Sequence, residues 1–348
     1  MNLTLKDFDF ELPKALIASY PTPKRTDARL LVLDRASGRT EHRIFRDVSE
    51  TLREGDLLVL NNTKVLPARL FGKRPTGGRV EALLLKPIDE NSWEVLVKPS
   101  RRVKKGVRLE FGENGVRLEG EVLDGPSGET GIRKIRFPSK DFREKLARIG
   151  RIPLPPYLDR PDEAVDREFY QTVFAEKEGA VASPTAGLHF DEALLGNLRR
   201  KGIEICFVTL HVSYGTFQPV QVEDFSKHRM YEEEYEISEK AARQIAEAKG
   251  EKRRIVACGT TVVRTLETVG ATHASALRPQ KGTTRIFIHP PFKFQIVDAM
   301  ITNFHLPKST LLMLVSAFAG RDFIFRAYQE AIGSGYRFYS YGDAMVIL

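Results

Sequence analysis

The amino-acid sequence predicts an α/β protein into which a small antiparallel β-barrel domain is inserted. Between residues 65 and 138, short segments of strand character are separated by Gly, Pro and Asn, and no helical period appears. After residue 161, amphipathic helical segments alternate with short apolar segments typical of buried strands. We therefore expect residues 1–62 and 151–348 to form the main α/β domain, and residues 63–150 to form the inserted barrel domain.

The first 150 residues predict a hairpin, a buried strand and then the barrel. Residues 30–45 alternate between apolar and polar side chains across an Ala-Ser-Gly turn, which is typical of a hairpin. Residues 56–63 form an apolar run that ends in a polar turn, as expected of a buried strand. The barrel strands are expected at 68–74, 79–87, 93–99, 107–111, 116–124 and 131–137.

After a proline-rich linker at 151–161, the remaining segments predict alternating helices and strands. Ser238 is a good N-cap and Gly250 a good stop for one helix. Ile324, Tyr328 and Ile332 recur every four residues and should form one face of the last helix. The expected helices are 191–202, 238–250, 260–270, 309–320 and 322–332, and the expected strands are 203–212, 253–259 and 283–290.

Composition excludes several classes of protein. Apolar residues make up 42% and charged residues 29%, and no apolar run approaches the roughly 20 residues of a membrane span. The first residues carry no basic segment followed by an apolar one, so we expect no secretory signal and a cytoplasmic protein. With only Cys206 and Cys258, each in an apolar run, a disulfide framework or thiolate metal cluster is excluded.

Positive charge is modest in sum but concentrated in a few segments. Lys and Arg total 54 against 46 Asp and Glu, and much of the excess lies at 98–108, 133–151 and 199–201. Any one cluster is equally compatible with a solvated face, but two within the predicted barrel domain favour a polyanionic partner such as nucleic acid. The candidate residues for contacts with such a nucleic acid are Arg101, Arg102, Lys104 and Lys105.

Four segments join a predicted strand to a turn or helix, where open backbone amides and glycine turns favour binding sites. They are 183–190, 211–220, 257–267 and 297–310. The first two contain His189 and His211. The third contains Gly259, Thr260, Thr261, Arg264 and Glu267, and the fourth contains Asp298, Asn303, His305 and Lys308.

Each segment also has a purely structural explanation. A lone histidine in an apolar turn is more often a core residue with one hydrogen bond, Thr-Thr after Gly is usually a helix cap, and Arg264 with Glu267 is usually a surface pair. The fourth segment is harder to explain in this way. Burying Asp, Asn and His costs roughly 1–3 kcal/mol for each group left unpaired, so these residues need mutual partners or a ligand.

Common catalytic motifs are absent from the sequence. It contains no G-x-x-x-x-G-K-[ST] phosphate loop. No G-x-G-x-x-G follows its first strand, which argues against a methyltransferase with a Rossmann fold. H-E-x-x-H and C-x-x-C do not occur, so a zinc centre is not expected, and neither does the G-x-S-x-G elbow.

Several long segments resemble one family over nearly the whole chain. PTAGLHF, HVSYGTFQPV, CGTTVVRTLE and NFHLPKSTLLMLVSA, with the ending YRFYSYGDAMVIL, are similar to the S-adenosylmethionine:tRNA ribosyltransferase-isomerases of the queuosine pathway. The resemblance implies a barrel-like α/β main domain with a smaller β-barrel domain. It also implies transfer of the ribosyl moiety of S-adenosylmethionine to 7-aminomethyl-7-deazaguanine at the tRNA wobble position, giving epoxyqueuosine-tRNA, adenine and methionine.

This chemistry needs a base, an acid for departing adenine, and exclusion of water. His189, His305, His211 and Asp298 are the candidates for proton transfer, with His189 favoured as base. The candidate substrate-binding residues are Gly259, Thr260, Thr261, Arg264, Glu267 and Asn303, with Arg264 expected to bind the methionine carboxylate.

Two other functional classes stay open: a non-catalytic tRNA-binding protein and an S-adenosylmethionine-dependent RNA methyltransferase. If the protein is a ribosyltransferase-isomerase, which is the hypothesis we favour, S-adenosylmethionine is a substrate, and no metal or other cofactor is expected. The expected partner is tRNA carrying the aminomethyl base, with no membrane, and we favour a monomer.

Overall fold

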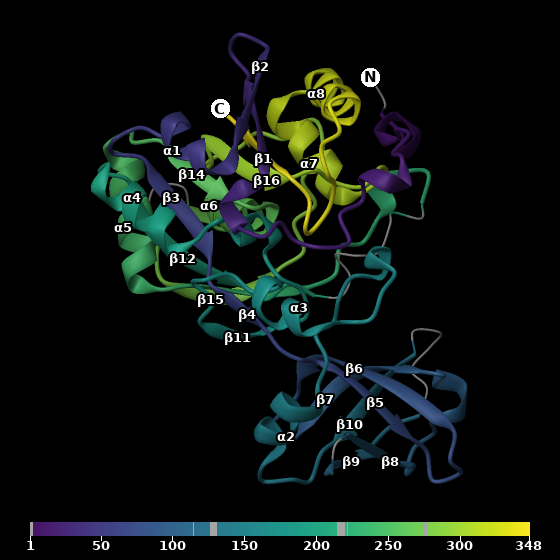
Figure 1. Cartoon of the computed structure of the whole chain (residues 1–348). Coiled ribbons are helices and arrows are strands. Elements are labelled where there is room, and N and C mark those ends of the chain that lie inside the picture. Colours follow the sequence, from purple (N-terminus) through teal and green to yellow (C-terminus); the bar gives the residue numbers. More distant parts are fainter. Residues whose placement is uncertain (1–2, 114, 126–130, 214–219, 221, 274–276) are drawn as a thin grey trace.

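The computed structural model describes the whole chain except residues 1–2, 114, 126–130, 214–219, 221 and 274–276. Figure 1 shows a larger α/β part that carries both termini and, at the bottom of the view, a smaller barrel. The predicted α/β class and the predicted small antiparallel β-barrel are both confirmed.

A nine-stranded mixed sheet forms the centre of the larger part. Its strand order is β15-β13-β12-β3-β14-β16-β17-β1-β2, running from β15 at one edge to β2 at the other. The neighbouring strands β12, β3, β14 and β16 are parallel, so their carboxyl ends lie at the same edge. The strands are β1 (Arg29–Asp34), β2 (Arg39–Ile44), β3 (Leu57–Asn61), β12 (Glu204–Leu210), β13 (Glu233–Ile237), β14 (Ile255–Cys258), β15 (Gln280–Thr284), β16 (Ala299–Asn303) and β17 (Ala344–Ile347).

The central strands are buried on both faces. Leu57 and Val59 of β3 pack into one core, while Leu58 and Leu60 pack into another. Side chains of α5 (Glu239–Gly250), α6 (Thr260–His273), α7 (Thr310–Ala319) and α8 (Arg321–Gly333) complete the first core. Those of α1 (Val48–Thr51) and α4 (Glu192–Arg200) complete the second, which explains why the strands read as continuous apolar runs.

Helix boundaries follow the predicted signals closely. The side chain of Ser238 accepts a hydrogen bond from the backbone N–H of Ala241 and so caps α5, as predicted. Ser309 caps α7 in the same way through Leu312. No helix in the described parts of the chain has both the length and the apolar character needed to cross a membrane.

The smaller part is a closed six-stranded barrel in the order β10-β7-β6-β5-β8-β9. Its six strands confirm the six predicted ones, and α2 (Phe142–Ile149) packs Phe142, Leu146 and Ile149 against the barrel core. The barrel strands are β5 (Arg69–Lys73), β6 (Arg79–Pro87), β7 (Ser92–Lys98), β8 (Arg108–Glu113), β9 (Val116–Val122) and β10 (Ile132–Arg136). The remaining elements are the pair β4 (Thr63–Val65) and β11 (Lys177–Ala180), and α3 (Ala164–Phe169).

The prediction of a strand at residues 283–290 is wrong in its bounds. Strand β15 instead spans Gln280–Thr284, and its register with β13 pairs Ile237 with Gln280 and Glu233 with Thr284. Because β13 begins at Glu233, it offers no further residue to pair with the apolar segment that follows. Ile286 and Phe287 still pack against the main core, so the apolar pattern reflects burial and not a ladder.

Glu267 has a structural role that its sequence position did not reveal. Its fully buried carboxylate accepts hydrogen bonds from the backbone N–H groups of Gln295, Ile296 and Val297, at 2.7, 3.0 and 2.9 Å. The side chain therefore fixes the segment that leads into β16.

Replacing Glu267 by Gln should lower the free energy of unfolding by about 2–4 kcal/mol, since an amide NH₂ would face backbone donors in a buried site. The measurement is urea unfolding of both proteins. The exposed Glu247→Gln on α5 is the matched control and should stay within about 0.5 kcal/mol of wild type. Equal stability of the Glu267 variant and the control would contradict this role.

Candidate active site

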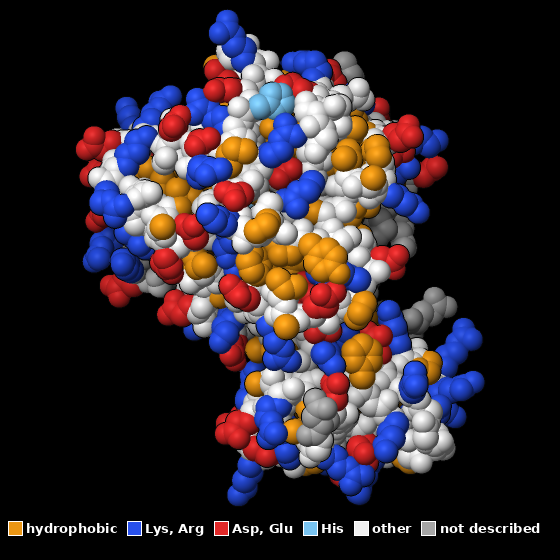
Figure 2. Space-filling view, in the orientation of Figure 1, with side chains coloured by type: hydrophobic (Ala, Val, Ile, Leu, Met, Phe, Trp, Pro, Cys, Tyr) orange, Lys and Arg blue, Asp and Glu red, His pale blue; other side chains and the backbone are white. Residues whose placement is uncertain are grey.

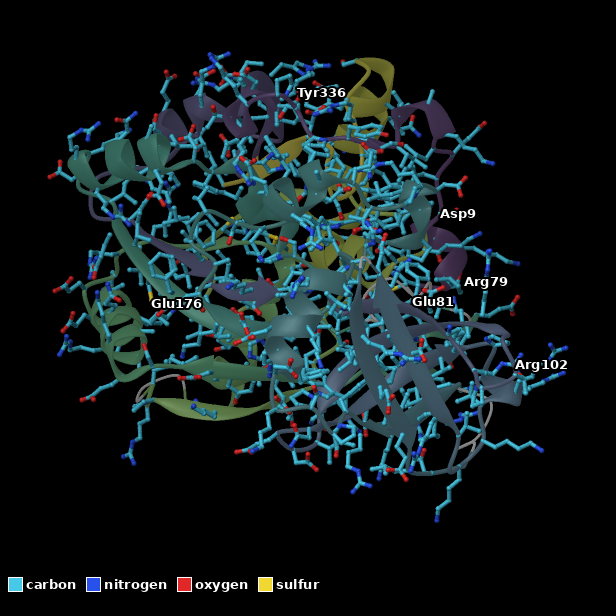
Figure 3. All side chains as sticks on the ribbon, turned by 60° about the horizontal axis from the view of Figure 1, so that its bottom comes forward. Asp9, Arg79, Glu81, Arg102, Glu176 and Tyr336 are labelled. Atoms are coloured by element: carbon cyan, nitrogen blue, oxygen red, sulfur yellow. The ribbon has the colours of Figure 1, made fainter. Side chains whose placement is uncertain are left out.

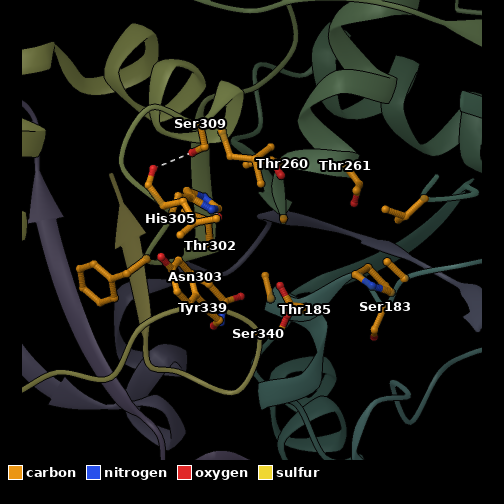
Figure 4. A pocket seen from close by; sticks show the side chains of 18 of the residues that line it. Ser183, Thr185, Thr260, Thr261, Thr302, Asn303, His305, Ser309, Tyr339 and Ser340 are labelled. Carbon is orange, nitrogen blue, oxygen red and sulfur yellow. Dashed lines mark hydrogen bonds between the residues drawn. The ribbon is translucent and has the colours of Figure 1, made fainter. Parts of the chain in front are cut away.

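A pocket lies at the carboxyl edge of the parallel strands, where β14 and β16 end. It holds about 730 Å³ of space, part of which is open to solvent, and Figure 4 shows it from close by. The described residues that line it come from 182–186, 259–261, 302–306 and 339–340, together with Tyr157, Val212, Ser309 and Leu311.

The pocket brings together five of the predicted site residues, from the third and fourth segments. Gly259 has a φ of +91°, so the chain can turn sharply from β14 into α6 and present Thr260 and Thr261 at the start of that helix. Asn303 and His305 reach the same pocket from the end of β16. Two segments about 45 residues apart in sequence thus meet because their strands are parallel neighbours.

His305 is a buried histidine in the pocket wall. Its Nε2 lies 2.9 Å from the Thr302 hydroxyl, and its backbone N–H donates to the hydroxyl of Tyr328 at 2.9 Å. Burial lowers the pKa of His305 to about 3, so the ring is neutral at pH 7. A neutral imidazole has one ring nitrogen without hydrogen that can accept a hydrogen bond from a bound molecule, and the lowered pKa makes it a weaker base than a free histidine.

His189 lies behind the pocket and is not among the described residues that line it. Its Nε2 is 3.1 Å from Nδ2 of Asn303, and its ring packs against Phe45 with centroids 4.9 Å apart. Burial, with smaller contributions from the charges of Arg337 and Arg25, lowers the pKa of His189 to about 3. Asn303 therefore separates the favoured candidate base from the pocket.

His211 lies near the pocket but does not line it in the described structure. Its Nδ1 is 2.8 Å from the hydroxyl of Thr63, and burial lowers its pKa. Its neighbour Val212 does line the pocket. The glycine turn expected after His211 falls at residues 214–219, which lie outside the described residues.

Asp298 is not brought to the pocket. It is exposed and precedes β16, where its carboxylate accepts the backbone N–H of Ile255 at 2.9 Å. Asn303 is the last residue of that strand and His305 lies just beyond it, and the five residues of β16 span roughly 16 Å. Asp298 and His305 are close in sequence, but β16 lies between them and holds their side chains at opposite ends of the strand.

Arg264 and Glu267 do not pair with each other, and neither is among the described residues lining the pocket. Arg264 forms a buried ion pair with Glu233 of β13, while Glu267 binds the backbone of 295–297. In this structure, the guanidinium expected to bind the methionine carboxylate is engaged by a carboxylate of the protein.

Three aromatic or hydroxyl side chains of the described lining lie outside the four segments singled out from the sequence: Tyr157, Tyr339 and Ser340. The rings of Tyr157 and Tyr339 have centroids 4.5 Å apart, and the hydroxyl of Tyr157 lies 2.5 Å from that of Ser340. Tyr157 comes from the proline-rich segment interpreted as a linker. The one sequence feature that could have drawn attention to Tyr157 is an aromatic residue among prolines. The spacing of residues along the sequence does not connect it with Tyr339.

The described lining of the pocket contains no Lys, Arg, Asp or Glu. Its polar groups are hydroxyls, one carboxamide and one imidazole. Among the described residues, Oδ1 of Asn303 and Oγ of Ser183 are buried without a hydrogen-bond partner. The pocket therefore suits an uncharged, partly apolar group that forms a few hydrogen bonds.

The predicted basic residues form a separate surface on the barrel, the basic loop, which comprises Arg101, Arg102, Lys104 and Lys105. All four are exposed, and Figures 2 and 3 show positive side chains along the outer edge of the barrel, with Arg102 pointing away from it. Within the described structure, no carboxylate lies within ion-pair distance of any of the four.

Arg133, which belongs to the second basic cluster, has a different role. It is 1% exposed, and its guanidinium donates to the carbonyls of Val103, Ser100 and Ile132 at 3.0, 2.8 and 2.7 Å. The residue therefore holds the basic loop from inside and adds no positive side chain to the surface. No group of three or more His, Cys, Asp or Glu in the described residues is arranged to hold a metal ion.

Comparison with known proteins gives the family. A model of the queuosine biosynthesis protein family matches residues 5–347. S-adenosylmethionine:tRNA ribosyltransferase-isomerases of Sulfurihydrogenibium sp. and Heliobacterium modesticaldum are 52% and 50% identical, over 99% and 98% of this chain and 100% and 98% of theirs.

A solved structure points the same way. The crystal structure of S-adenosylmethionine tRNA ribosyltransferase from Thermotoga maritima aligns with a TM-score of 0.56 and 39% identity, covering 98% of this chain and all of that one. Since the family model and the relatives both extend over nearly the full length, the chain belongs to the queuosine biosynthesis protein family, whose relatives named above are S-adenosylmethionine:tRNA ribosyltransferase-isomerases.

Proposed function

We propose that the protein transfers the ribosyl moiety of S-adenosylmethionine to the aminomethyl group of 7-aminomethyl-7-deazaguanine at the wobble position of tRNA. The products are epoxyqueuosine-tRNA, adenine and methionine. The observation that carries this proposal is the pocket at the carboxyl edge of β14 and β16, whose described lining has no charged side chain, in a chain that matches its transferase relatives end to end.

The reaction begins with a proton on carbon. The sulfonium acidifies the C5′ hydrogens, so that a base can remove one and adenine can leave as the ribose opens. The tRNA amine then adds, a carbocycle closes, and an oxygen displaces methionine to form the epoxide. The walls of a partly enclosed pocket keep water from the reactive intermediates.

His305 is the best placed of the three predicted histidines for proton transfer. It lines the pocket and is neutral, whereas His189 is separated from the pocket by Asn303 and His211 lies to one side. Its hydrogen bond to Thr302 fixes the plane of the ring. We therefore assign the proton-transfer role to His305 in preference to His189.

The tRNA is proposed to contact the basic loop of the barrel. Its four cations are exposed and have no carboxylate partner in the described structure, so they are available for phosphate groups. Arg133 holds the backbone that carries them, which reduces the conformational freedom lost on binding.

A single incubation tests the proposed function. The protein is mixed with S-adenosylmethionine and tRNA carrying the aminomethyl base, and the products are identified by mass spectrometry. Adenine and methionine should appear together with the modified tRNA. S-adenosylhomocysteine would instead indicate a methyltransferase, and tRNA binding without turnover would indicate a binding protein.

Replacing His305 by Gln should lower turnover by about 10²–10⁴, which is the usual contribution of one positioned proton-transfer group. Binding of S-adenosylmethionine should largely survive, because the loss concerns the transition state. Single-turnover kinetics and calorimetric titration measure the two effects. His42→Gln, at a half-exposed histidine outside the pocket, is the control and should keep normal turnover.

Reversing the charge of Arg101, Arg102, Lys104 and Lys105 should raise KM for tRNA, leave S-adenosylmethionine binding unchanged, and flatten the dependence of tRNA affinity on salt. The matched control reverses four exposed cations of the main domain on α4 and α5, namely Arg199, Lys240, Arg243 and Lys249. An unaltered KM for the barrel variant, or an equal rise for the control, would place the tRNA surface elsewhere.

A further inference from the structure

We propose that the pocket receives the adenine ring of S-adenosylmethionine against Tyr339, and that His189 is a positioning residue that holds this wall through Asn303. The inference rests on the proposed function, because it takes S-adenosylmethionine to be the substrate. It gives His189 a different role from that of a base.

Tyr339 is held in a backbone conformation that a tyrosine rarely adopts. Its φ is +74°, in the left-handed region where a side chain other than glycine is strained. Three backbone contacts keep it there: its N–H donates to the carbonyl of Phe304 at 3.2 Å, and its carbonyl accepts from Nδ2 of Asn303 and the N–H of Gly342, both at 3.0 Å. Strain maintained by so many contacts is typical of functional positions.

The strained backbone places an aromatic ring in the pocket wall. Tyr339 lines the pocket beside Tyr157, with the two rings inclined at 37°. Aromatic side chains bind nucleobases by stacking on their faces, and this contact needs no charge. A wall of two tyrosines is therefore suited to a planar heterocycle.

The described lining has no charged side chains, and this indicates which chemical group of the two substrates the pocket can bind. The methionine part carries an ammonium, a carboxylate and a sulfonium, and the deazaguanine arrives with tRNA phosphates. Those groups call for counter-charges, which the described wall does not offer. Adenine is planar and neutral, and two lining residues, Asn303 and Ser183, each have a buried side-chain oxygen without a hydrogen-bond partner.

His189 is connected to this wall by a hydrogen bond with Asn303. The two hydrogens of Nδ2 of Asn303 go to the carbonyl of Tyr339 and to Nε2 of His189. The imidazole must therefore present an unprotonated Nε2, which its burial favours. Without that acceptor, the carboxamide loses one of the two bonds that orient it, and the carbonyl of Tyr339 loses a fixed partner.

The first test is calorimetric titration with free adenine, which requires no tRNA and no turnover. Tyr339→Leu should weaken adenine binding by about 5- to 150-fold, since it removes one base–aromatic contact, whereas Tyr339→Phe keeps the ring and should bind like wild type. Adenine binding by Tyr339→Leu that equals wild type would overturn the proposal.

The second test separates positioning from proton transfer. The carbonyl of Gln at position 189 can replace Nε2 as an acceptor, so His189→Gln should keep both adenine affinity and kcat, while His189→Leu should lose adenine affinity. In an Asn303→Ala background, His189→Leu should cause no further loss. A His189→Gln variant with normal adenine binding and a kcat lowered by orders of magnitude would make His189 the proton-transfer group and overturn its positioning role.

A third measurement uses the wild-type protein, so it does not depend on how the variants fold. Nuclear Overhauser contacts from the adenine ring protons should reach tyrosine ring protons, and free 7-aminomethyl-7-deazaguanine should not displace adenine. If the deazaguanine binds there instead, or if no tyrosine contact appears while the enzyme turns over, this inference fails and the proposed function stands. If adenine binds against a tyrosine ring but the protein does not turn over its substrates, the proposed function is refuted and the adenine site is not.

Discussion

The arrangement of the site depends on the burial of β3, β14 and β16 on both faces. A strand covered on both sides has no position for an unpaired polar side chain along its length, so polar groups can begin only where each strand ends. Because the strands are parallel, those ends meet at one edge. The pocket is the result of this constraint.

Asn61 shows how tightly that edge is built. It closes β3, and its Oδ1 accepts the N–H groups of Leu210 and Thr63, while its Nδ2 donates to the carbonyl of Leu210 and to the hydroxyl of Thr261. One carboxamide thus connects the ends of β3 and β12 with the first turn of α6. The buried core positions the strands, and this polar layer at their carboxyl ends sets how those ends face the pocket.

The sequence predicts the architecture well, because periodicity and turn residues are local signals. The six barrel strands and the capped helices α5 and α7 are of this kind. The lining of the candidate pocket could be predicted only in part, since its residues meet through tertiary contacts. Gly259, Asn303 and His305 lie at or just beyond the carboxyl ends of strands and reach the pocket, whereas Asp298 precedes β16 and lies at its other end. Tyr157 and Tyr339 meet although they lie far apart in the sequence, and no spacing rule connects them.

Arg133 gives the barrel a property that is relevant to evolutionary change and to protein engineering. Its guanidinium grips main-chain carbonyls of the basic loop, and every amino acid supplies a carbonyl. The path of the loop is therefore independent of the side chains displayed on it. Those side chains can be substituted one at a time, by natural mutation or by design. The ligand preference of the loop can then change while its backbone conformation stays the same.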